Sequence, residues 1–335
     1  MARPVKEQVV VITGASSGIG RETALAFGRV GASVVLAARS EADLQEVASQ
    51  VERLGGRALV VPTDVADWPQ VQRLADTAID HFGRIDTWVN NAAVSIYATV
   101  EQLTPEEIDR VIHVNLLGQI YGMKAAVPHL KRNNGGSLIN VASALAERSA
   151  PLQAAYCASK HGIRGFSESL RLELARDGSN ITVTVIEPSS MNTPLFSHAR
   201  SKMGVRPQPI PPVYEPRTVA EAILFVAEHP QRSVVVGGAG KLLTVMQRLS
   251  PALLDRYMLQ GERAFKQQKT DTPDAGQDNL YTPMPGTGST TGDFGQTSKS
   301  VSAYTRSLGQ HPNRERAAIA AFLLAAFALV RRIGR

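Results

Sequence analysis

The chain has 335 residues, of which 43% are hydrophobic and 20% are charged, so it has ample material for a core and is not a disordered protein. Its one cysteine, Cys157, excludes an internal disulfide framework. The net charge of +6 comes without a basic cluster interleaved with aromatic residues, which disfavours nucleic-acid binding. The first residues, MARPVKEQ, contain no long apolar stretch, so we expect no signal peptide.

The first predicted element is a buried strand at residues 9–12, followed by a glycine-rich turn and a helix. Residues 9–12 are a β-branched apolar run, and apolar residues recur at helical spacing after Gly20. A helix that begins in the turn from Gly14 to Gly20 presents unpaired N–H groups and the positive end of its dipole, which suits a pyrophosphate. A glycine-rich turn without a ligand is the alternative interpretation.

Strand-like and helix-like segments then alternate along the chain. Further strands are predicted at residues 32–38, 57–65, 86–92, 136–143, 181–188 and 233–238, with amphipathic segments between several of them. This alternation predicts an α/β fold: a Rossmann-like, doubly wound parallel sheet of about seven strands with helices on both faces. Ligands of such folds bind beyond the carboxyl ends of the strands, so the residues after each strand are site candidates.

The second predicted strand ends in Arg39 and Ser40, without an acidic residue. An Asp or Glu at this place would accept hydrogen bonds from the adenosine ribose hydroxyls of NAD, whereas an arginine can pair with the 2′-phosphate of NADP. We therefore expect NADP(H) as the cofactor. A solvent-exposed arginine at the start of a helix is the alternative interpretation of Arg39.

A candidate acid/base pair lies on the long helix predicted over residues 155–175. Tyr156 and Lys160 are four residues apart and so share one helix face. An unperturbed phenol has a pKa of about 10. A nearby cation would lower this pKa towards neutrality. Ser143, at the end of a predicted strand, can hydrogen-bond a substrate carbonyl beside Tyr156.

From about Lys6 to Lys241 the chain resembles the classical short-chain dehydrogenases/reductases. The matching motifs are TGASSGIG at residues 13–20, NNAA at residues 90–93, Asn115 within VIHVNLLG, Ser143, and Tyr156 with Lys160. The resemblance implies that Tyr156 is the general acid/base, that Ser143 polarises the carbonyl, and that Lys160 binds the nicotinamide ribose and lowers the pKa of the phenol.

The resemblance also implies roles for asparagines and for the cofactor pocket. Asn115 would hold the water of a proton relay, with helix packing as the alternative, and Asn90 would brace the sheet. Asp64 and Val65 would contact the adenine edge, with a helix cap as the alternative for Asp64. The expected cofactor-binding residues are Gly14, Ser16, Ser17, Gly18, Ile19, Gly20, Arg39, Ser40, Asp64, Val65, Asn91, Ala92, Tyr156, Lys160, Pro188, Ser189 and Thr193; no metal is expected.

Two residues depart from the family pattern, and the expected substrate pocket is apolar. Ala93 and Ser189 stand where the family usually has glycine, which alters the shape of the nicotinamide pocket.

Residues 192–216, rich in proline, are predicted to form a lid. The residues expected to line the substrate cleft are Val94, Ser95, Ile96, Tyr97, Ala144, Leu145, Ala146, Met191, Leu195 and Phe196, without paired arginines for an acidic group.

These features predict an NADP(H)-dependent oxidoreductase that interconverts a hydrophobic alcohol and its ketone or aldehyde by hydride transfer. A nonenzymatic NADP-binding sensor on a membrane is the alternative from another functional class, although a sensor would not need the acid/base residues. An epimerase or dehydratase on the related extended fold is disfavoured by the glycine spacing. We expect a homo-oligomer that binds a small substrate and no nucleic acid.

The chain continues well beyond the predicted catalytic and NADP-binding domain of residues 1–241. Residues 242–270 are predicted to form short amphipathic helices. Residues 271–315, rich in glycine and proline, are predicted to be a flexible low-complexity linker with a small docked patch at residues 279–281. Residues 316–335 are predicted to form an apolar C-terminal helix.

The apolar run AAIAAFLLAAFALV at residues 317–330 is flanked by arginines on both sides. As a helix these residues would span roughly 21 Å, less than the ~30 Å of a bilayer's hydrocarbon core. We nevertheless favour a membrane anchor, because the run is apolar all round, follows a long linker, and has arginines that can reach the headgroups. Docking on the core or a dimer helix is the alternative. The expected location is cytoplasmic, with membrane attachment through this segment.

Overall fold

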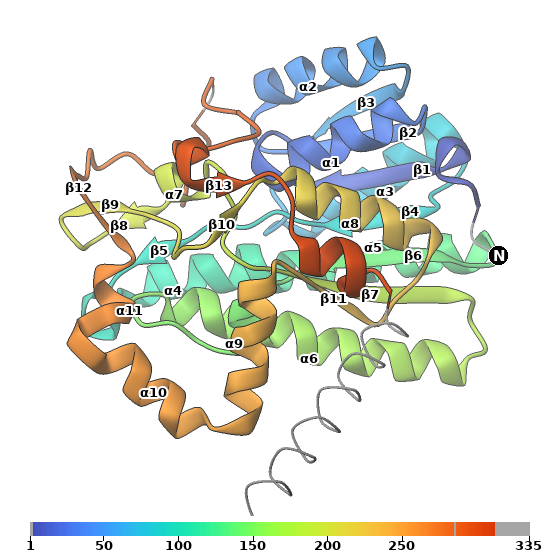
Figure 1. The fold of residues 1–335 in the computed structure, drawn as a ribbon. Coiled ribbons are helices and arrows are strands. Elements are labelled where there is room, and N and C mark those ends of the chain that lie inside the picture. Colours follow the sequence, from blue (N-terminus) through green and yellow to red (C-terminus); the bar gives the residue numbers. More distant parts are fainter. Residues whose placement is uncertain (1–2, 285, 312–335) are drawn as a thin grey trace, which may run out of the picture.

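A parallel sheet of seven strands forms the centre of the molecule (Figure 1). The computed structural model describes residues 3–284 and 286–311. The strands stand in the order β11-β7-β6-β4-β1-β2-β3, and each neighbouring pair is parallel. Their bounds are β1 Val9–Thr13, β2 Ser33–Ala38, β3 Arg57–Pro62, β4 Thr87–Asn90, β6 Gly136–Val141, β7 Ile181–Pro188 and β11 Ser233–Val236. The predicted doubly wound sheet is thereby confirmed.

Helices cover both faces of the sheet because alternate strand residues point to opposite sides. The helices are α1 Gly18–Arg29, α2 Glu41–Arg53, α3 Trp68–Phe82, α4 Pro105–Ile112, α5 Gly118–Arg132, α6 Ala154–Arg176 and α8 Arg217–Glu228. Val10 and Ile12 of β1 pack with α1, α2 and α8, whereas Val9 and Val11 pack with α3, α4, α5 and α6. Short helical turns are η1 Val5–Glu7, η2 Val100–Gln102, η3 His113–Leu117 and η4 Ala144–Ala146.

The strand order creates a crevice at the carboxyl end of β1. The chain runs from β1 to β2 and β3 on one side, and then returns to β4 on the other side of β1. The connections from β1 and β4 therefore diverge, which leaves room for a ligand between them. This crevice lies where the predicted cofactor residues begin.

The proline-rich segment predicted to be a lid forms short elements that pair with other parts of the chain. These elements are α7 Leu195–His198, β8 Arg200–Ser201, β9 Val205–Pro207 and β10 Val213–Tyr214. The three strands pair with strands elsewhere in the chain: β8 with β5 Ile96–Tyr97, β9 with β12 Lys269–Pro273, and β10 with β13 Ser298–Lys299. The segment thus joins the domain to the C-terminal extension.

The C-terminal extension begins with helices and then runs back along the domain (Figure 1). The helices are α9 Gly238–Leu249, α10 Pro251–Leu259, η5 Gln260–Glu262 and α11 Arg263–Lys266, and the later turns are η6 Gly295–Thr297 and η7 Thr305–Gly309. Composition predicts a flexible linker from residue 271, whereas in the described part Leu280 is fully buried and Thr305 Oγ1 accepts a hydrogen bond from Gly237 N at 2.9 Å. The patch predicted at residues 279–281 does lie against the domain.

The C-terminal apolar run at residues 317–330 lies outside the described residues. Within residues 3–284 and 286–311, no helix combines the length and the apolar character that crossing a bilayer requires. The predicted membrane anchor therefore stays a prediction.

Candidate active site

The turn between β1 and α1 is tight enough to require its glycines. Gly14 has a φ of +68°, in the left-handed region that favours glycine. A Cβ on Gly20 would overlap the carbonyl oxygen of Gly14. Asn91, which follows β4, supports the turn because its Nδ2 donates to the carbonyl oxygens of Thr13 at 3.0 Å and Gly14 at 3.1 Å. The start of α1 can therefore be approached closely by a ligand.

A cavity of about 720 Å³ opens beside this turn. Every predicted cofactor-binding residue lines it except Gly20, whose contribution is the shape of the turn. Three of the four predicted catalytic residues, Ser143, Tyr156 and Lys160, line the same cavity, whereas Asn115 does not. The structure thus brings the predicted cofactor and acid/base residues together in one space.

Residues beyond β2 and β3 line the part of the cavity predicted to take the adenosine. Arg39 is partly buried, and its guanidinium donates to backbone carbonyls of the C-terminal extension, so it is not a freely exposed arginine. Ser40 caps α2 by accepting from Asp43 N at 3.4 Å. Asp64 pairs with Arg110 at 2.8 Å, while Asp67 is the cap of α3. The helix-cap alternative for Asp64 is therefore wrong.

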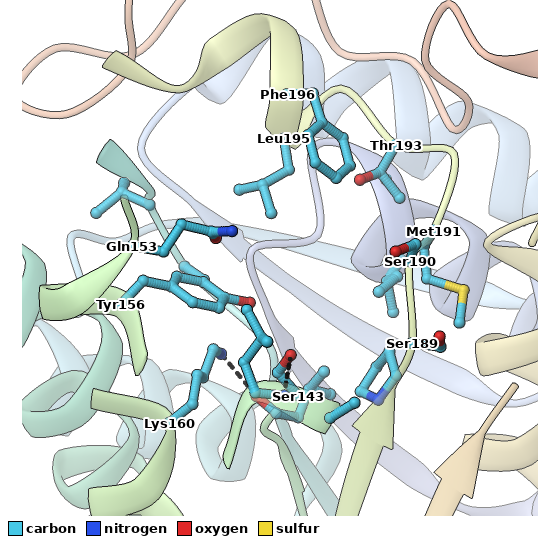
Figure 2. A pocket seen from close by; sticks show the side chains of 18 of the residues that line it. Ser143, Gln153, Tyr156, Lys160, Ser189, Ser190, Met191, Thr193, Leu195 and Phe196 are labelled. Carbon is cyan, nitrogen blue, oxygen red and sulfur yellow. Dashed lines mark hydrogen bonds between the residues drawn. The ribbon is translucent and has the colours of Figure 1, made fainter. Parts of the chain in front are cut away.

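Tyr156 and Lys160 point from α6 into the cavity (Figure 2). Lys160 Nζ lies 5.3 Å from the centroid of the Tyr156 ring and donates to the carbonyl oxygen of Val141 at 2.9 Å. Lys160 is 1% exposed and Tyr156 is 9% exposed. Their four-residue spacing therefore places both groups on one buried helix face, as the sequence predicts.

Burial changes the titration of both groups in opposite directions. Burial raises the pKa of Tyr156 above its ordinary value, and a hydrogen bond with Ser143 opposes this rise only in part. Burial lowers the pKa of Lys160 to about 7. The expectation of a lowered phenol pKa is therefore wrong, because loss of hydration outweighs any attraction between the two groups. A buried phenol stays protonated at neutral pH.

Ser143 follows β6 at the carboxyl edge of the sheet. Its Oγ accepts a hydrogen bond from the N–H of Leu145 at 3.1 Å, which makes it the cap of η4 (Figure 2). Its hydroxyl is also within hydrogen-bonding reach of the Tyr156 phenol. The hydroxyl groups of Ser143 and Tyr156 can therefore both donate hydrogen bonds to one substrate oxygen.

Asn115 lies in the π-turn η3 between α4 and α5. Its Oδ1 accepts from Val94 N at 2.8 Å, and its Nδ2 donates to the Val94 carbonyl at 2.9 Å and to Ser159 Oγ at 3.3 Å. These contacts fit the helix-packing alternative, and the water relay stays a prediction. Asn90 donates to Asn140 Oδ1 at 2.9 Å, so it braces neighbouring strands as expected. The π-turn at His113–Leu117 is not among the elements predicted from the sequence.

Apolar side chains from the domain and from the extension form the remaining walls. The predicted residues that line the cavity are Val94, Tyr97, Ala144, Leu145, Met191, Leu195 and Phe196. Ser95, Ile96 and Ala146 do not line it, and the last two pack in core clusters instead. The sequence analysis missed the lining residues of α9 and α10, which are Leu242, Leu243, Met246, Leu254, Tyr257 and Met258. Their amphipathic pattern was visible, but the family resemblance ends before them.

Both departures from the family pattern lie at the cavity. Ala93 and Ser189 line it. Ser189 N donates to the Val236 carbonyl at 2.8 Å, and the Ser189 side chain faces Gly237 and Gly240. Glycines on the opposite segment thus leave room for the serine.

The residues that match a known family coincide with this domain. The profile of the family described as short chain dehydrogenase matches residues 8–204. The chain belongs to the short-chain dehydrogenase/reductase family. The protein is therefore an oxidoreductase, and its predicted cofactor and acid/base residues line one cavity.

Relatives of this short-chain dehydrogenase/reductase extend the comparison. YxnA, an uncharacterized oxidoreductase of Bacillus subtilis, is 42% identical over 258 residues, which cover 76% of this chain and 72% of YxnA. FabG, a 3-oxoacyl-acyl-carrier-protein reductase of Thermotoga maritima, is 33% identical over 233 residues, covering 69% of this chain and 94% of FabG. An alcohol dehydrogenase of the archaeon Thermococcus sibiricus, solved in complex with 5-hydroxy-NADP, is 26% identical with a TM-score of 0.61, covering 68% and 95% of the two chains.

Proposed function

We propose that this protein uses NADP(H) to interconvert a hydrophobic alcohol and its ketone or aldehyde. The observation that carries this proposal is that Ser143, Tyr156 and Lys160 line the same cavity as the glycine-rich turn. Similarity to an alcohol dehydrogenase solved with 5-hydroxy-NADP, and to a 3-oxoacyl-acyl-carrier-protein reductase, supports both the cofactor and the reaction class.

The residues of the cavity fit a nicotinamide dinucleotide. The close-packed glycine turn presents the start of α1 to the cavity, where a pyrophosphate would lie beside Gly18, whose N–H donates to the Ser289 carbonyl of the extension. Arg39 and Ser40 would hold the 2′-phosphate, and Lys160 would hold the nicotinamide ribose. The groups proposed for the adenine and the carboxamide are Asp64, Val65, Pro188, Ser189 and Thr193. The bound cofactor supplies a hydride to a carbonyl carbon in reduction, or accepts one from an alcohol in oxidation.

Tyr156 is the proposed proton donor to the carbonyl oxygen in reduction. A phenol already carries its proton at neutral pH, and burial raises its pKa further, so Tyr156 is in the protonated form that a general acid requires. Ser143 donates a hydrogen bond to the same oxygen and so polarises the carbonyl. In oxidation the same phenol would act as the base, and it would have to lose its proton first.

The substrate proposed from the cavity walls is apolar and has no acidic group. Leucine and methionine side chains of α9 and α10 complete the walls that the domain begins. Arg148, which also lines the cavity, is already paired with the carboxylate of Asp255. An apolar wall excludes water and binds chain or ring carbons in proportion to the area that they bury.

The test is a screen of ketones and aldehydes of graded chain length with NADPH and with NADH. The proposal expects turnover with NADPH that improves as the apolar part of the substrate lengthens. Tight NADPH binding without turnover of any carbonyl or alcohol would instead favour the sensor alternative.

We further propose that the protein is a homo-oligomer, and analytical sedimentation would measure its mass in solution directly.

A further inference from the structure

A segment of the extension crosses the residue proposed to hold the 2′-phosphate. We call residues 278–284 and 286–289 the C-terminal strap. Arg39 Nη2 donates to the carbonyl oxygen of Asn279 at 2.6 Å, and Arg39 Nη1 donates to that of Tyr281 at 2.9 Å. The strap thus fixes the guanidinium from the outside of the domain.

The other end of the strap lies on the glycine-rich turn. Gly18 N, in the first turn of α1, donates to the carbonyl oxygen of Ser289 at 2.8 Å. Arg21 donates to the carbonyl oxygen of Gly288. The approach is close, because a Cβ on Gly288 would lie 2.7 Å from the carbonyl oxygen of Ser16. The strap therefore contacts both groups proposed to bind cofactor phosphates.

The strap is anchored to the domain by residues outside the proposed cofactor site. Leu280 is 0% exposed and belongs to the core cluster beneath α3, α4 and α5. Arg110 Nε donates to the Leu280 carbonyl at 2.9 Å, and Asp278 pairs with Arg200 at 2.8 Å. Since the strap has no helix or strand of its own, its attachment depends on these few contacts.

The cavity continues beneath the strap. Five strap residues line it together with the glycine-rich turn, namely Asn279, Pro283, Met284, Thr287 and Gly288. Arg39 has five N–H donors, and the strap carbonyls need only two of them. The strap consequently forms a wall over an open space, and the guanidinium keeps donors for a phosphate.

We propose that the C-terminal strap is the outer wall of the cofactor site and holds the adenosine half of NADP(H) beneath it. The cofactor enters and leaves when the strap lifts from Arg39 and from the start of α1. This inference rests on the proposed function, because it requires a dinucleotide in the cavity. It also assigns Arg39 a second role, as the residue that positions the strap.

The test compares cofactor dissociation from wild-type protein and from a variant in which the strap is attached less firmly to the domain. Leu280→Glu places a carboxylate in the core cluster and should release the strap. We expect NADPH, displaced by excess NADP⁺ in a stopped-flow experiment, to leave the variant at least about tenfold faster, a change that corresponds to the loss of a few strap contacts. NADPH should also slow hydrogen exchange of the strap amides in the wild type.

Two further variants control for damage to the fold. Leu259→Glu makes the same change at a leucine that is 65% exposed on α10 and outside the cavity lining, so it should leave the dissociation rate unchanged. Asp278→Asn removes the ion pair with Arg200 without touching the core, and should speed dissociation in the same direction. Asp293→Asn, in the exposed pair with Arg206, is its matched control.

The possible results distinguish a failure of the strap inference from a failure of the proposed function. Equal NADPH dissociation rates in wild type, Leu280→Glu and Asp278→Asn would overturn the strap inference. Slower dissociation from the two variants would also overturn it, because the strap would then compete with the cofactor for the site. Wild-type protein that binds neither NADPH nor NADH would overturn the proposed function itself. Faster dissociation from the strap variants alone would support the inference.

Discussion

Lys160 links the stability of this protein to pH. Its pKa is lowered to about 7 by burial, compared with about 10.4 in an unfolded chain. Between these two values the folded protein binds fewer protons than the unfolded chain, so the free energy of unfolding rises with pH in this window. Below pH 7 the buried charge opposes folding by a few kcal/mol, at ~1.4 kcal/mol for each unit between the two pKa values.

Lys160→Met should therefore stabilise the protein in a pH-dependent way. We expect the gain in unfolding free energy to be largest below about pH 7 and to disappear near pH 10. Urea unfolding at several pH values, without added cofactor, measures this. Lys131→Met, at an exposed lysine of α5, is the control and should show no such trend. A gain that does not vary with pH would contradict the lowered pKa.

Arg39 should decide between NADPH and NADH. Arg39→Asp replaces the proposed 2′-phosphate partner by a repelling charge, and we expect NADPH binding to weaken by roughly 10–100-fold while NADH binding changes much less. Fluorescence titration with both cofactors measures the difference. Because Arg39 also holds the strap, Leu280→Ala is the control, and it should weaken both cofactors alike. A wild-type protein that binds NADH more tightly than NADPH would refute the assigned preference.

At the scale of elements, the turn between β1 and α1 should tolerate no side chain at Gly20. A Cβ there would overlap the Gly14 carbonyl oxygen and lie 2.5 Å from Asn91 Nδ2, so Gly20→Ala must displace the turn. We expect loss of measurable NADPH binding and a lower melting temperature. Gly165→Ala, in the exposed face of α6 with open space around it, should stabilise the protein by ~0.5–1 kcal/mol and keep NADPH affinity. NADPH affinity of Gly20→Ala equal to wild type would remove the turn from the cofactor site.

The sequence predicts the sheet and most of the site for a physical reason. Buried parallel strands need continuous apolar runs, and the residues after them must lie at one edge, so patterns around β1, β2 and β6 locate Gly14, Arg39 and Ser143. The pKa of Tyr156 could not be predicted in this way. It depends on how deeply the phenol is buried, which the spacing from Lys160 does not reveal.

The contacts of the extension cannot be predicted in the same way, because they leave little trace in composition. The strap is held by arginine side chains that donate to backbone carbonyls, and any residue type can supply a carbonyl. Leu280 is a single apolar residue without a periodic pattern around it, yet it is fully buried. Glycine and proline content alone therefore predicts a linker, whereas residues 279–281 contact the domain.

At the scale of the whole molecule, two truncations should separate the tail from the strap. Removing residues 312–335 deletes the apolar run at 317–330 and keeps every described contact of the extension. If that run is a membrane anchor, the truncated protein should no longer sediment with lipid vesicles, while its NADPH affinity and melting temperature stay unchanged. A full-length protein that stays soluble without detergent and does not bind vesicles would contradict the anchor.

Removing residues 271–335 should have a different effect, because it also deletes the strap, most of strand β12 and all of strand β13. We expect weaker NADPH binding and a lower melting temperature than for the shorter truncation, since Leu280 leaves its place in the core cluster. Thermal melts and NADPH titrations of both truncations give the comparison. Identical behaviour of the two truncated proteins would show that residues 271–311 contribute nothing to the site.

Carbonyl reduction by wild type and by Tyr156→Phe tests the central claim most directly. The substitution removes only the phenol oxygen, so NADPH affinity, measured in parallel, should stay nearly unchanged. We predict that wild type oxidises NADPH with a hydrophobic ketone or aldehyde, and that turnover by Tyr156→Phe falls by at least about a hundredfold. Turnover close to wild type in Tyr156→Phe, with cofactor bound normally, would contradict the role of Tyr156 as the proton donor of this active site.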